Sequence, residues 1–313
     1  MQVWNRKELI ETPEVGAGAM RFAYENPVGR ALTKAILCRS FVSNLYAAWQ
    51  KSRLSKGKVW KFVAQYHISL DDCTAQEFPN FNAFFTRQRK NYVNQTTDNE
   101  LPAVADSKLT ALPIDKNRVF TVKGVPYTAA ELLENEKLAA EYAGGICMIF
   151  RLSPDDYHRY VYPDAGTQEK TVAIKGVLHS VNPIAGSLGV YRRNARRYTV
   201  LHTAHFGDVV QMEVGALLVG KICNHNETAG SFAKLQEKGY FEYGGSTVIL
   251  LLKKDAVTVD ADILQYSAKG IETKVKIGER IAAQTLWGGD MSPKFREAAD
   301  GTDEQACRQW VVF

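Results

Sequence analysis

The chain has no apolar run of the roughly 20 residues that a membrane-spanning helix needs. Its first residues, Met-Gln-Val-Trp-Asn-Arg-Lys-Glu, also lack the apolar segment of a signal peptide. Cysteine is scarce, and the five residues are scattered and odd in number, which favours a reducing compartment over a disulfide framework. We therefore expect a peripheral protein on the cytoplasmic side of a membrane, without signal peptide or transmembrane helix.

Other absences narrow the function. No Cys-x-x-Cys pair accompanies His202-Thr-Ala-His205 or Cys223-Asn-His225, so these spacings are weak indications of zinc and we expect no metal site. No internal repeat, low-complexity segment or nucleic-acid motif is present, and the net charge is only +5. We therefore expect no nucleic-acid partner.

Positive charge is concentrated near the N-terminus. Residues 1–61 carry eleven Lys and Arg against four Glu, a local excess of seven positive charges. A helical pattern in this region predicts an apolar stripe of Leu32, Ile36, Phe41, Leu45 and Trp49, with Arg30, Lys34, Arg39, Lys51 and Arg53 on the polar side. Such a basic amphipathic helix is typical of a membrane-surface element, but also of an ordinary surface helix packed on a core.

The order of apolar patterns predicts an α+β fold, with an N-terminal helical region followed by a mainly antiparallel β core. Helices are expected over roughly 28–66 and 128–142, and β-branched runs dominate from about residue 103 onward. We predict a helical, membrane-facing region at 1–100, a catalytic core at 101–286 and a loose tail at 287–313. Phe81, Phe84 and Phe85 favour core packing, with Arg87 closing an ion pair.

The most informative segment is Gly244-Gly245-Ser246-Thr247, which is followed at once by the apolar run 248–252. One interpretation is a tight Gly-Gly turn between two strands. The other is self-cleavage, because the Gly245 carbonyl carries no bulky neighbour and the Ser246 hydroxyl can attack it. Elimination and hydrolysis of the resulting ester would leave a pyruvoyl group, an electron sink made from the chain itself.

Several further motifs occur in a characteristic order. They are Phe81-Asn-Ala-Phe-Phe-Thr-Arg87, Ala105-Asp-Ser-Lys-Leu-Thr110, Asp156-Tyr-His-Arg159, His179-Ser-Val-Asn-Pro-Ile-Ala185, the Val-rich stretch 206–222, and Glu237-Lys-Gly-Tyr-Phe-Glu-Tyr-Gly-Gly-Ser-Thr247. Over roughly residues 75–285 this set resembles the phosphatidylserine decarboxylase family of self-cleaving pyruvoyl enzymes.

The resemblance implies a role for each matching residue. Ser246 becomes the pyruvoyl cofactor, and Gly245 becomes the new C-terminus of the larger fragment. Asp106 matches the Asp that helps to activate the serine, and His158 matches the His that acts at the substrate and the pyruvoyl group.

The chain departs from the family pattern at two positions. Val161 stands where the family has a second His, the partner of the Asp, and Ser107 stands where it has Gly. Among the nearby candidates His179, His202 and His205, we prefer His179 as the substitute base, because the segment that follows it matches one that the family places near the site.

The resemblance implies an autocatalytic carboxy-lyase that converts phosphatidylserine to phosphatidylethanolamine and CO2 through a Schiff base to the pyruvoyl group. Its expected partners are an anionic phospholipid surface, to which it binds peripherally, and its own cleaved fragment in a tight heterodimer. Two alternatives stay open: a pyruvoyl decarboxylase of a soluble amino acid, and an uncleaved, non-catalytic lipid-binding relative.

Overall fold

The computed structural model describes residues 1–12, 17–33, 40–122, 124–180, 190–216, 221–244 and 246–285. Gly245, Lys34, Ile36, Arg39 and the predicted tail at 287–313 lie outside the described residues.

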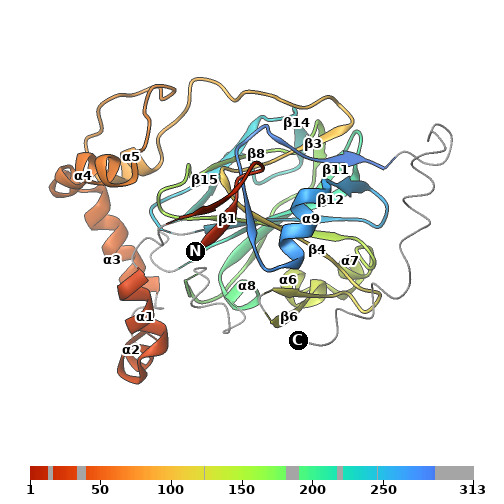
Figure 1. Cartoon of the computed structure of the whole chain (residues 1–313), viewed down its shortest axis with the longest axis horizontal. Helices are drawn as coiled ribbons and strands as arrows, with labels where there is room; N and C mark the ends of the chain where they lie inside the picture. Colours follow the sequence, from red (N-terminus) through yellow and green to blue (C-terminus); the bar gives the residue numbers. More distant parts are fainter. Residues whose placement is uncertain are drawn as a thin grey trace.

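One large sheet forms the body of the molecule (Figure 1). Its eleven strands follow the order β14-β9-β11-β12-β16-β7-β4-β18-β1-β2, with β10 paired to β11. Among these described strands every ladder is antiparallel except that of β1 with β18. The bounds are β14 Gly230–Phe232, β9 Gly166–Gln168, β11 Arg196–Thr203, β12 Gly207–Val214, β16 Ser246–Leu252, β7 Ile146–Leu152, β4 Ser107–Pro113, β18 Glu272–Val275, β1 Gln2–Trp4, β2 Leu9–Glu11 and β10 Val172–Ile174.

Three smaller sheets complete the β part. They are β13 (Ile222–Asn224) with β15 (Glu237–Phe241) and β8 (Arg159–Val161), then β17 (Val257–Val259) with β19 (Arg280–Gln284) and β3 (Glu100–Pro102), and the hairpin of β5 (Val119–Val122) with β6 (Val125–Thr128). The first of them packs on the large sheet, where the Gln211 amide donates to the Val161 carbonyl and buried Lys238 pairs with buried Glu213 at 2.7 Å. Because β16 has a strand on each side and layers on both faces, all seven of its residues are buried.

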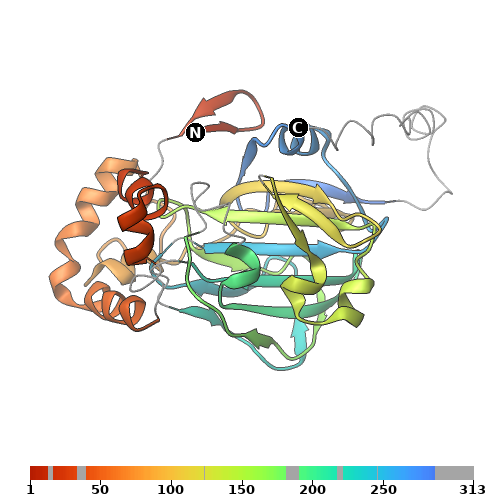
Figure 2. The ribbon, with the colours of Figure 1, turned by 90° about the horizontal axis from the view of Figure 1, so that it is seen from below.

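The N-terminal helices gather at one end of the β body (Figures 1 and 2). They are α1 Ala17–Glu25, α2 Pro27–Leu32, α3 Ser40–Lys51, the 3₁₀ turn η2 Arg53–Ser55, α4 Gly57–Tyr66 and α5 Phe81–Phe85. Their own apolar core is made of Val59, Leu70, Cys73, Phe78, Phe81, Phe84 and Phe85, and the half-buried Tyr243 packs against it. The predicted core packing of the three phenylalanines is confirmed. This second core places the helical layer against the chain that leads into β16.

The α+β prediction is confirmed, but several boundaries differ. The helix expected over 128–142 is two helices, α6 (Ala129–Leu133) and α7 (Glu136–Ala140). They separate because Glu134 adopts a left-handed backbone and the Asn135 side chain caps α7 by accepting from Leu138 N. The sequence patterns also missed β1 and β2, through which residues 1–12 extend the large sheet. The remaining helices are α8 (Val190–Arg193) and α9 (Ala261–Ala268).

Among the residues that the structure describes, no helix is both long and apolar enough to cross a membrane.

Candidate active site

Ser246 is the first residue of β16, in the middle of the large sheet. It pairs with Leu152 of β7, and its neighbour Thr247 pairs with Val214 of β12. The Ser246 side chain is fully buried, and its Oγ has no hydrogen-bond partner among the described residues. A buried hydroxyl left without a partner costs roughly 1–3 kcal/mol, so its retention at this position requires an explanation. The predicted cleavage partner, Gly245, lies outside the described residues.

His158 is the second buried polar group with a free atom in this part of the molecule. It precedes β8, and its backbone carbonyl accepts from Phe241 N at 2.9 Å, five residues before Ser246. The ring Nδ1 lies 3.0 Å from the Asp156 carbonyl oxygen. Because a carbonyl only accepts, Nδ1 carries the proton and Nε2 keeps its lone pair. Nε2 is buried without a partner in the described part of the chain.

The surroundings keep the His158 imidazole neutral. Burial, together with the positive charges of Arg87 and Lys108, lowers its pKa to about 3, although the backbones of Asp156 and Gly244 favour the protonated ring. A neutral imidazole with a free Nε2 is a proton acceptor throughout the physiological pH range. Its contact with the Gly244 backbone places this acceptor two residues before Ser246.

Aromatic rings hold His158 and the approach to β16 in place. Phe85 of α5 packs against the His158 ring in a tilted arrangement with centroids 4.0 Å apart, and the Tyr243 ring centroid lies 5.0 Å from that of Phe85. Tyr46 of α3 covers Tyr243 at 5.4 Å, and Lys51 of the same helix pairs with Glu242 at 2.9 Å. The helical layer therefore packs directly on Glu242 and Tyr243, and its aromatic rings shield this approach to the site from water.

The predicted ion pair of Arg87 is wrong. Arg87 is buried, yet no carboxylate of the described residues lies within 4.0 Å of it. Its guanidinium instead lies over the rings of Phe84 and Tyr157, at 4.8 and 5.7 Å from their centroids. Burial lowers the pKa of Arg87, and the uncompensated charge acts on His158.

Asp106 does not contact a histidine in the described structure. One carboxylate oxygen accepts from Arg89 Nη2 at 2.6 Å, and the other accepts from Ile277 N at 2.9 Å. Val161, where the family resemblance leads us to expect a His, is fully buried in β8. Arg89 is thus the cationic partner of Asp106 in the described structure.

The backbone of His179 is held near Ser246 by the side chain of Asn194. The Asn194 side chain accepts from His179 N and donates to the carbonyls of both His179 and Gly215, at 2.9, 2.7 and 2.7 Å. Gly215 follows Val214, whose partner Thr247 follows Ser246, so the antiparallel register sets Gly215 beside Ser246. Burial, followed by the charge of Arg193, lowers the pKa of His179. Asn194 therefore anchors the His179 backbone at the end of the sheet where Ser246 lies.

His202 and His205 belong to the other end of the sheet. His202 pairs with Asp208, one residue before Val209, which pairs with Leu252 at the far end of β16. Six residues of strand, about 20 Å at roughly 3.3 Å per residue, separate this position from Ser246. His202 bonds to Asp208 at 2.7 Å and His205 to Asp164 at 3.1 Å. Neither reaches the Ser246 hydroxyl.

Sequence reasoning missed Tyr243 and Asn194, although both position the site. Tyr243 directly precedes Gly244 and Gly245, and its closeness to Ser246 in the sequence could have indicated that it lies at the site. Asn194 carries no motif, and only the pairing of strands shows that its amide joins His179 to Gly215. No group of three or more His, Cys, Asp or Glu able to hold a metal occurs in the described part of the chain.

Comparison with known proteins decides the family. A family model described as phosphatidylserine decarboxylase matches residues 81–283. The chain is 41% identical over 286 residues to phosphatidylserine decarboxylase proenzyme 2 of Clostridium acetobutylicum, covering 89% of this chain and 97% of that protein. It is 39% identical to the phosphatidylserine decarboxylase proenzyme of Clostridium novyi over 91% of this chain and 99% of that protein, and 36% identical to that of Clostridium perfringens over 90% and 99%.

The chain belongs to the phosphatidylserine decarboxylase family. It is accordingly an enzyme of the carboxy-lyase class, as the sequence motifs predict. The matched region contains Ser246, His158, Asp106 and His179, together with both departures, Val161 and Ser107.

Proposed function

We propose that this enzyme decarboxylates phosphatidylserine with a pyruvoyl group that it makes by cutting itself before Ser246. The observation that carries the proposal is the fully buried Ser246 Oγ, which has no partner among the described residues although it opens a central strand. Most buried hydroxyls in native proteins are bonded to a neighbour, and among the unbonded ones of the described residues Ser246 is the one that directly follows the Gly-Gly pair. The names of the relatives, which call them proenzymes, support maturation by cleavage.

The proposed maturation uses the chain and one water molecule. Ser246 Oγ loses its proton to a base and bonds to the Gly245 carbonyl carbon, and the Gly245–Ser246 amide bond breaks, which leaves an ester. Loss of the α-proton expels the Gly245 carboxylate and turns residue 246 into dehydroalanine. Addition of water and release of ammonia then leave a pyruvoyl group, in amide linkage to Thr247, at the N-terminus of the smaller fragment.

The pyruvoyl carbonyl supplies an electron sink for the electrons that remain when the substrate amine has condensed with it and CO2 leaves. His158 supports this chemistry as a proton carrier, since its Nε2 is free, neutral and close to Gly244. Phe85 and Tyr243 orient the ring and exclude water. We assign His158 to the return of a proton to the substrate α-carbon.

The two fragments are expected to stay together as a tight heterodimer. After cleavage β16 belongs to the smaller fragment, but it lies between β12 and β7 of the larger one. The strands β18 and β19 of the smaller fragment likewise pair with β4 and β3. Separation would break these four ladders and expose the fully buried side chains of β16.

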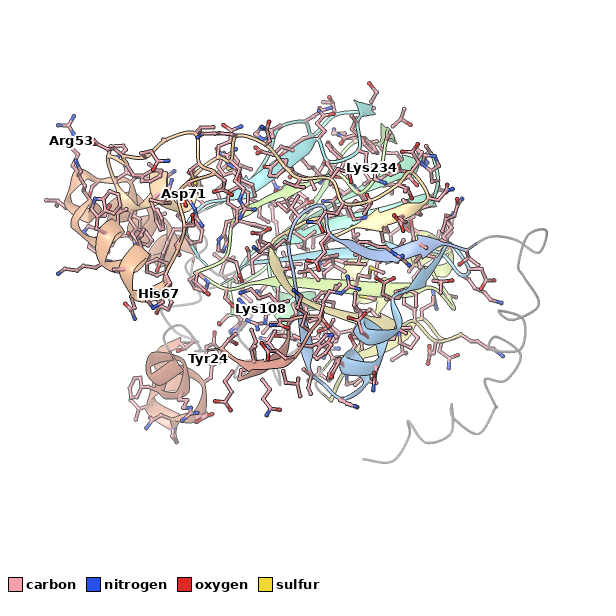
Figure 3. All side chains as sticks on the ribbon, turned by 45° about the horizontal axis from the view of Figure 1, so that its top comes forward. Tyr24, Arg53, His67, Asp71, Lys108 and Lys234 are labelled. Carbon is pink, nitrogen blue, oxygen red and sulfur yellow. The ribbon has the colours of Figure 1, made fainter. Side chains whose placement is uncertain are left out.

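The helical layer supports peripheral binding to an anionic membrane. Six large apolar side chains on it are more than a third exposed: Phe22, Val28, Leu45, Trp49, Leu54 and Trp60. Exposed cations stand among them, notably Arg53, Lys56 and Lys61, and Figure 3 shows Arg53 at the outer edge of the layer. Apolar side chains combined with Lys and Arg are what an anionic lipid surface attracts. Leu45 and Trp49 belong to the stripe predicted from the sequence.

Vesicle binding tests this surface. We expect the protein to sediment with phosphatidylserine vesicles at low ionic strength and to be released as salt rises, because the attraction of Lys and Arg is screened. The double variant Leu54→Ser/Trp60→Ser should weaken sedimentation about ten-fold or more and slow phosphatidylethanolamine formation on vesicles. Its turnover of a short-chain soluble phosphatidylserine should stay within two-fold of the parent.

Val93 supplies the matched control, since it is 68% exposed but lies outside the N-terminal helices. Val93→Ser should bind vesicles as the parent does. Equal sedimentation of the double variant and the parent would contradict the membrane surface. A protein that ignores vesicles yet decarboxylates a free amino acid would favour the soluble-substrate alternative.

The base for maturation is tested at His179. If His179 serves Ser246, His179→Ala should accumulate uncut precursor, and Val161→His in that background should restore part of the cleavage. The control is His202→Ala, because His202 lies about 20 Å away along the strands. Denaturing mass spectrometry of freshly folded protein measures the uncut fraction. Normal cleavage in His179→Ala would remove His179 from this role.

The uncleaved relative remains the second candidate function, and one observation favours it. Asp106 is paired with Arg89 and lies without a histidine beside it in the described structure. If maturation requires a histidine bonded to Asp106, the described structure does not provide that histidine, and the precursor would stay uncut. Intact mass of the folded wild-type protein separates the two candidates.

A further inference from the structure

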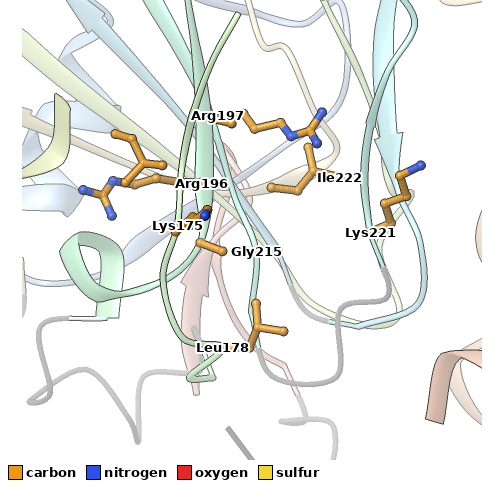
Figure 4. A pocket seen from close by; sticks show the side chains of 10 residues that line it. Lys175, Leu178, Arg196, Arg197, Gly215, Lys221 and Ile222 are labelled. Carbon is orange, nitrogen blue, oxygen red and sulfur yellow. The ribbon is translucent and has the colours of Figure 1, made fainter. Parts of the chain in front are cut away.

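A pocket lies beside Ser246 on the same face of the large sheet. Its volume is about 280 Å³, close to the roughly 300 Å³ at which ligand pockets begin. Lys175, Gly215, Lys221 and Ile222 are among the residues that line it, and Figure 4 shows them around the opening. The pocket therefore places the positive charges of Lys175 and Lys221 at the end of the sheet that carries Ser246.

The register of the strands shows that the pocket and Ser246 lie on the same face of the large sheet. Ala173 pairs with Arg197, Arg197 with Glu213, and Glu213 with Val248, which makes one row across four strands. Residues two apart along a strand point to the same side. The next row toward the end of the sheet is therefore Ala195, Gly215 and Ser246, and the 2.9 Å bond from Gly215 N to the Ala195 carbonyl confirms this pairing. The β10–β11 register ends at Ile174, since Ala195 N donates to the Val177 carbonyl, and Lys175 lines the pocket beside this row.

Two small residues form the floor of the pocket next to Ser246. They are Gly215 and Ala195, on strands spaced about 4.8 Å apart. A Cβ on Gly215 would stand 3.2 Å from Leu178 Cδ2 and 3.9 Å from Ile222 Cδ1, so these two side chains lie over the glycine and form the wall of the pocket there. A larger residue at position 215 would push them into the pocket and narrow it.

The charges around the pocket favour an anionic ligand. Lys175 and Lys221 are exposed, and neither has a carboxylate within 4.0 Å among the described residues. The other charges facing the pocket are already paired, Arg197 with Glu227 and Glu213 with Lys238. Arg196 points to the opposite side of the sheet, where it donates to the Leu132 and Glu131 carbonyls. The net charge available to a ligand is therefore positive.

We propose that this pocket binds the phosphodiester of the substrate headgroup, with Lys175 as its principal contact and Lys221 on the opposite wall. The inference rests on the proposed function, in which the substrate amine reacts at residue 246. The phosphorus of a phosphoserine headgroup is four bonds from that amine, so the phosphate comes to lie over Gly215 and Ala195. A lysine ammonium pairs with phosphate oxygens through charge-assisted hydrogen bonds.

Kinetics with soluble substrates test the pocket. With matured enzyme and a short-chain phosphatidylserine, Lys175→Ala should raise KM about ten-fold with little change in kcat, and Lys175→Arg should stay within about three-fold of the parent. Lys170→Ala is the matched control, because Lys170 is an exposed lysine on the other side of β10. It should leave KM unchanged. An equal KM for Lys175→Ala and the parent would overturn the proposal.

A binding measurement separates this inference from the proposed function. Uncleavable Ser246→Ala protein should bind glycerophosphoserine in a calorimeter, and Lys175→Ala in that background should weaken binding about ten-fold. This result would uphold the pocket even if the wild-type protein never cut itself. Inorganic phosphate that binds through Lys175 without being displaced by glycerophosphoserine would show a generic anion site and overturn the assignment to the headgroup.

Discussion

Ser246→Ala is expected to remain one chain of 313 residues, while the wild-type protein separates under denaturing conditions into residues 1–245 and 246–313. Alanine has no nucleophile to attack the preceding carbonyl, so neither ester nor pyruvoyl group can form. Decarboxylation should fall to background. Intact mass spectrometry measures both species, and the smaller wild-type fragment should resist N-terminal sequencing because a pyruvoyl group has no free amine.

Thr247 provides the control for this experiment. Its Oγ1 is also buried without a partner in the described structure, but neighbouring residues of a strand point to opposite faces. Thr247→Val should therefore still be cut before residue 246. Folding of every variant is checked by its circular dichroism spectrum. A wild-type protein that is folded and yet uncut throughout would refute the self-processing mechanism and leave the lipid-binding relative.

His158→Gln is expected to slow decarboxylation by about 10²–10⁴-fold while the chain still cuts itself. Glutamine approximates the size of the ring and keeps a polar end, but it cannot accept and return a proton near neutral pH. The low pKa of about 3 means that the wild-type imidazole is unprotonated at pH 5–8 in the uncleaved chain. Turnover of a soluble phosphatidylserine by protein that has matured fully provides the measurement.

His225→Gln is the matched control for His158. His225 is exposed and bonds to Glu237 at 2.6 Å, so its loss should leave turnover within two-fold of the parent. If His158→Gln instead accumulated uncut precursor, His158 rather than His179 would be the base that activates Ser246. Unchanged turnover would remove His158 from the chemistry.

The sequence already contained the local parts of the site. An apolar run directly after Gly-Gly-Ser-Thr predicts a buried strand with a serine at its start, and β16 is that strand. The β-branched runs predicted the antiparallel core, since alternating or continuous apolar patterns report burial by sheet neighbours. The pattern of phenylalanines predicted the second core. These features depend on neighbours in the chain, which a sequence displays directly.

Only the tertiary structure showed which histidines lie near Ser246 and which residue pairs with Asp106. The sequence offered three histidines to replace the one missing at Val161, and only the register of β11 on β12 and β16 places His202 and His205 at the far end. The pairing of Asp106 with Arg89 was equally hidden, because the two lie 17 positions apart and no periodicity connects them.

Composition and motif order by themselves determined the α+β class, the family and the serine to be tested. The tertiary structure alone decided which charged and polar groups surround that serine. The reason is the strand order: β16 lies between β12 and β7, and β10 and β11 add their residues to the same face. The pairing of strands, unlike a hydrophobic pattern, cannot be read from a local stretch of sequence, so the row of Ala195, Gly215 and Ser246 exists only in the folded sheet.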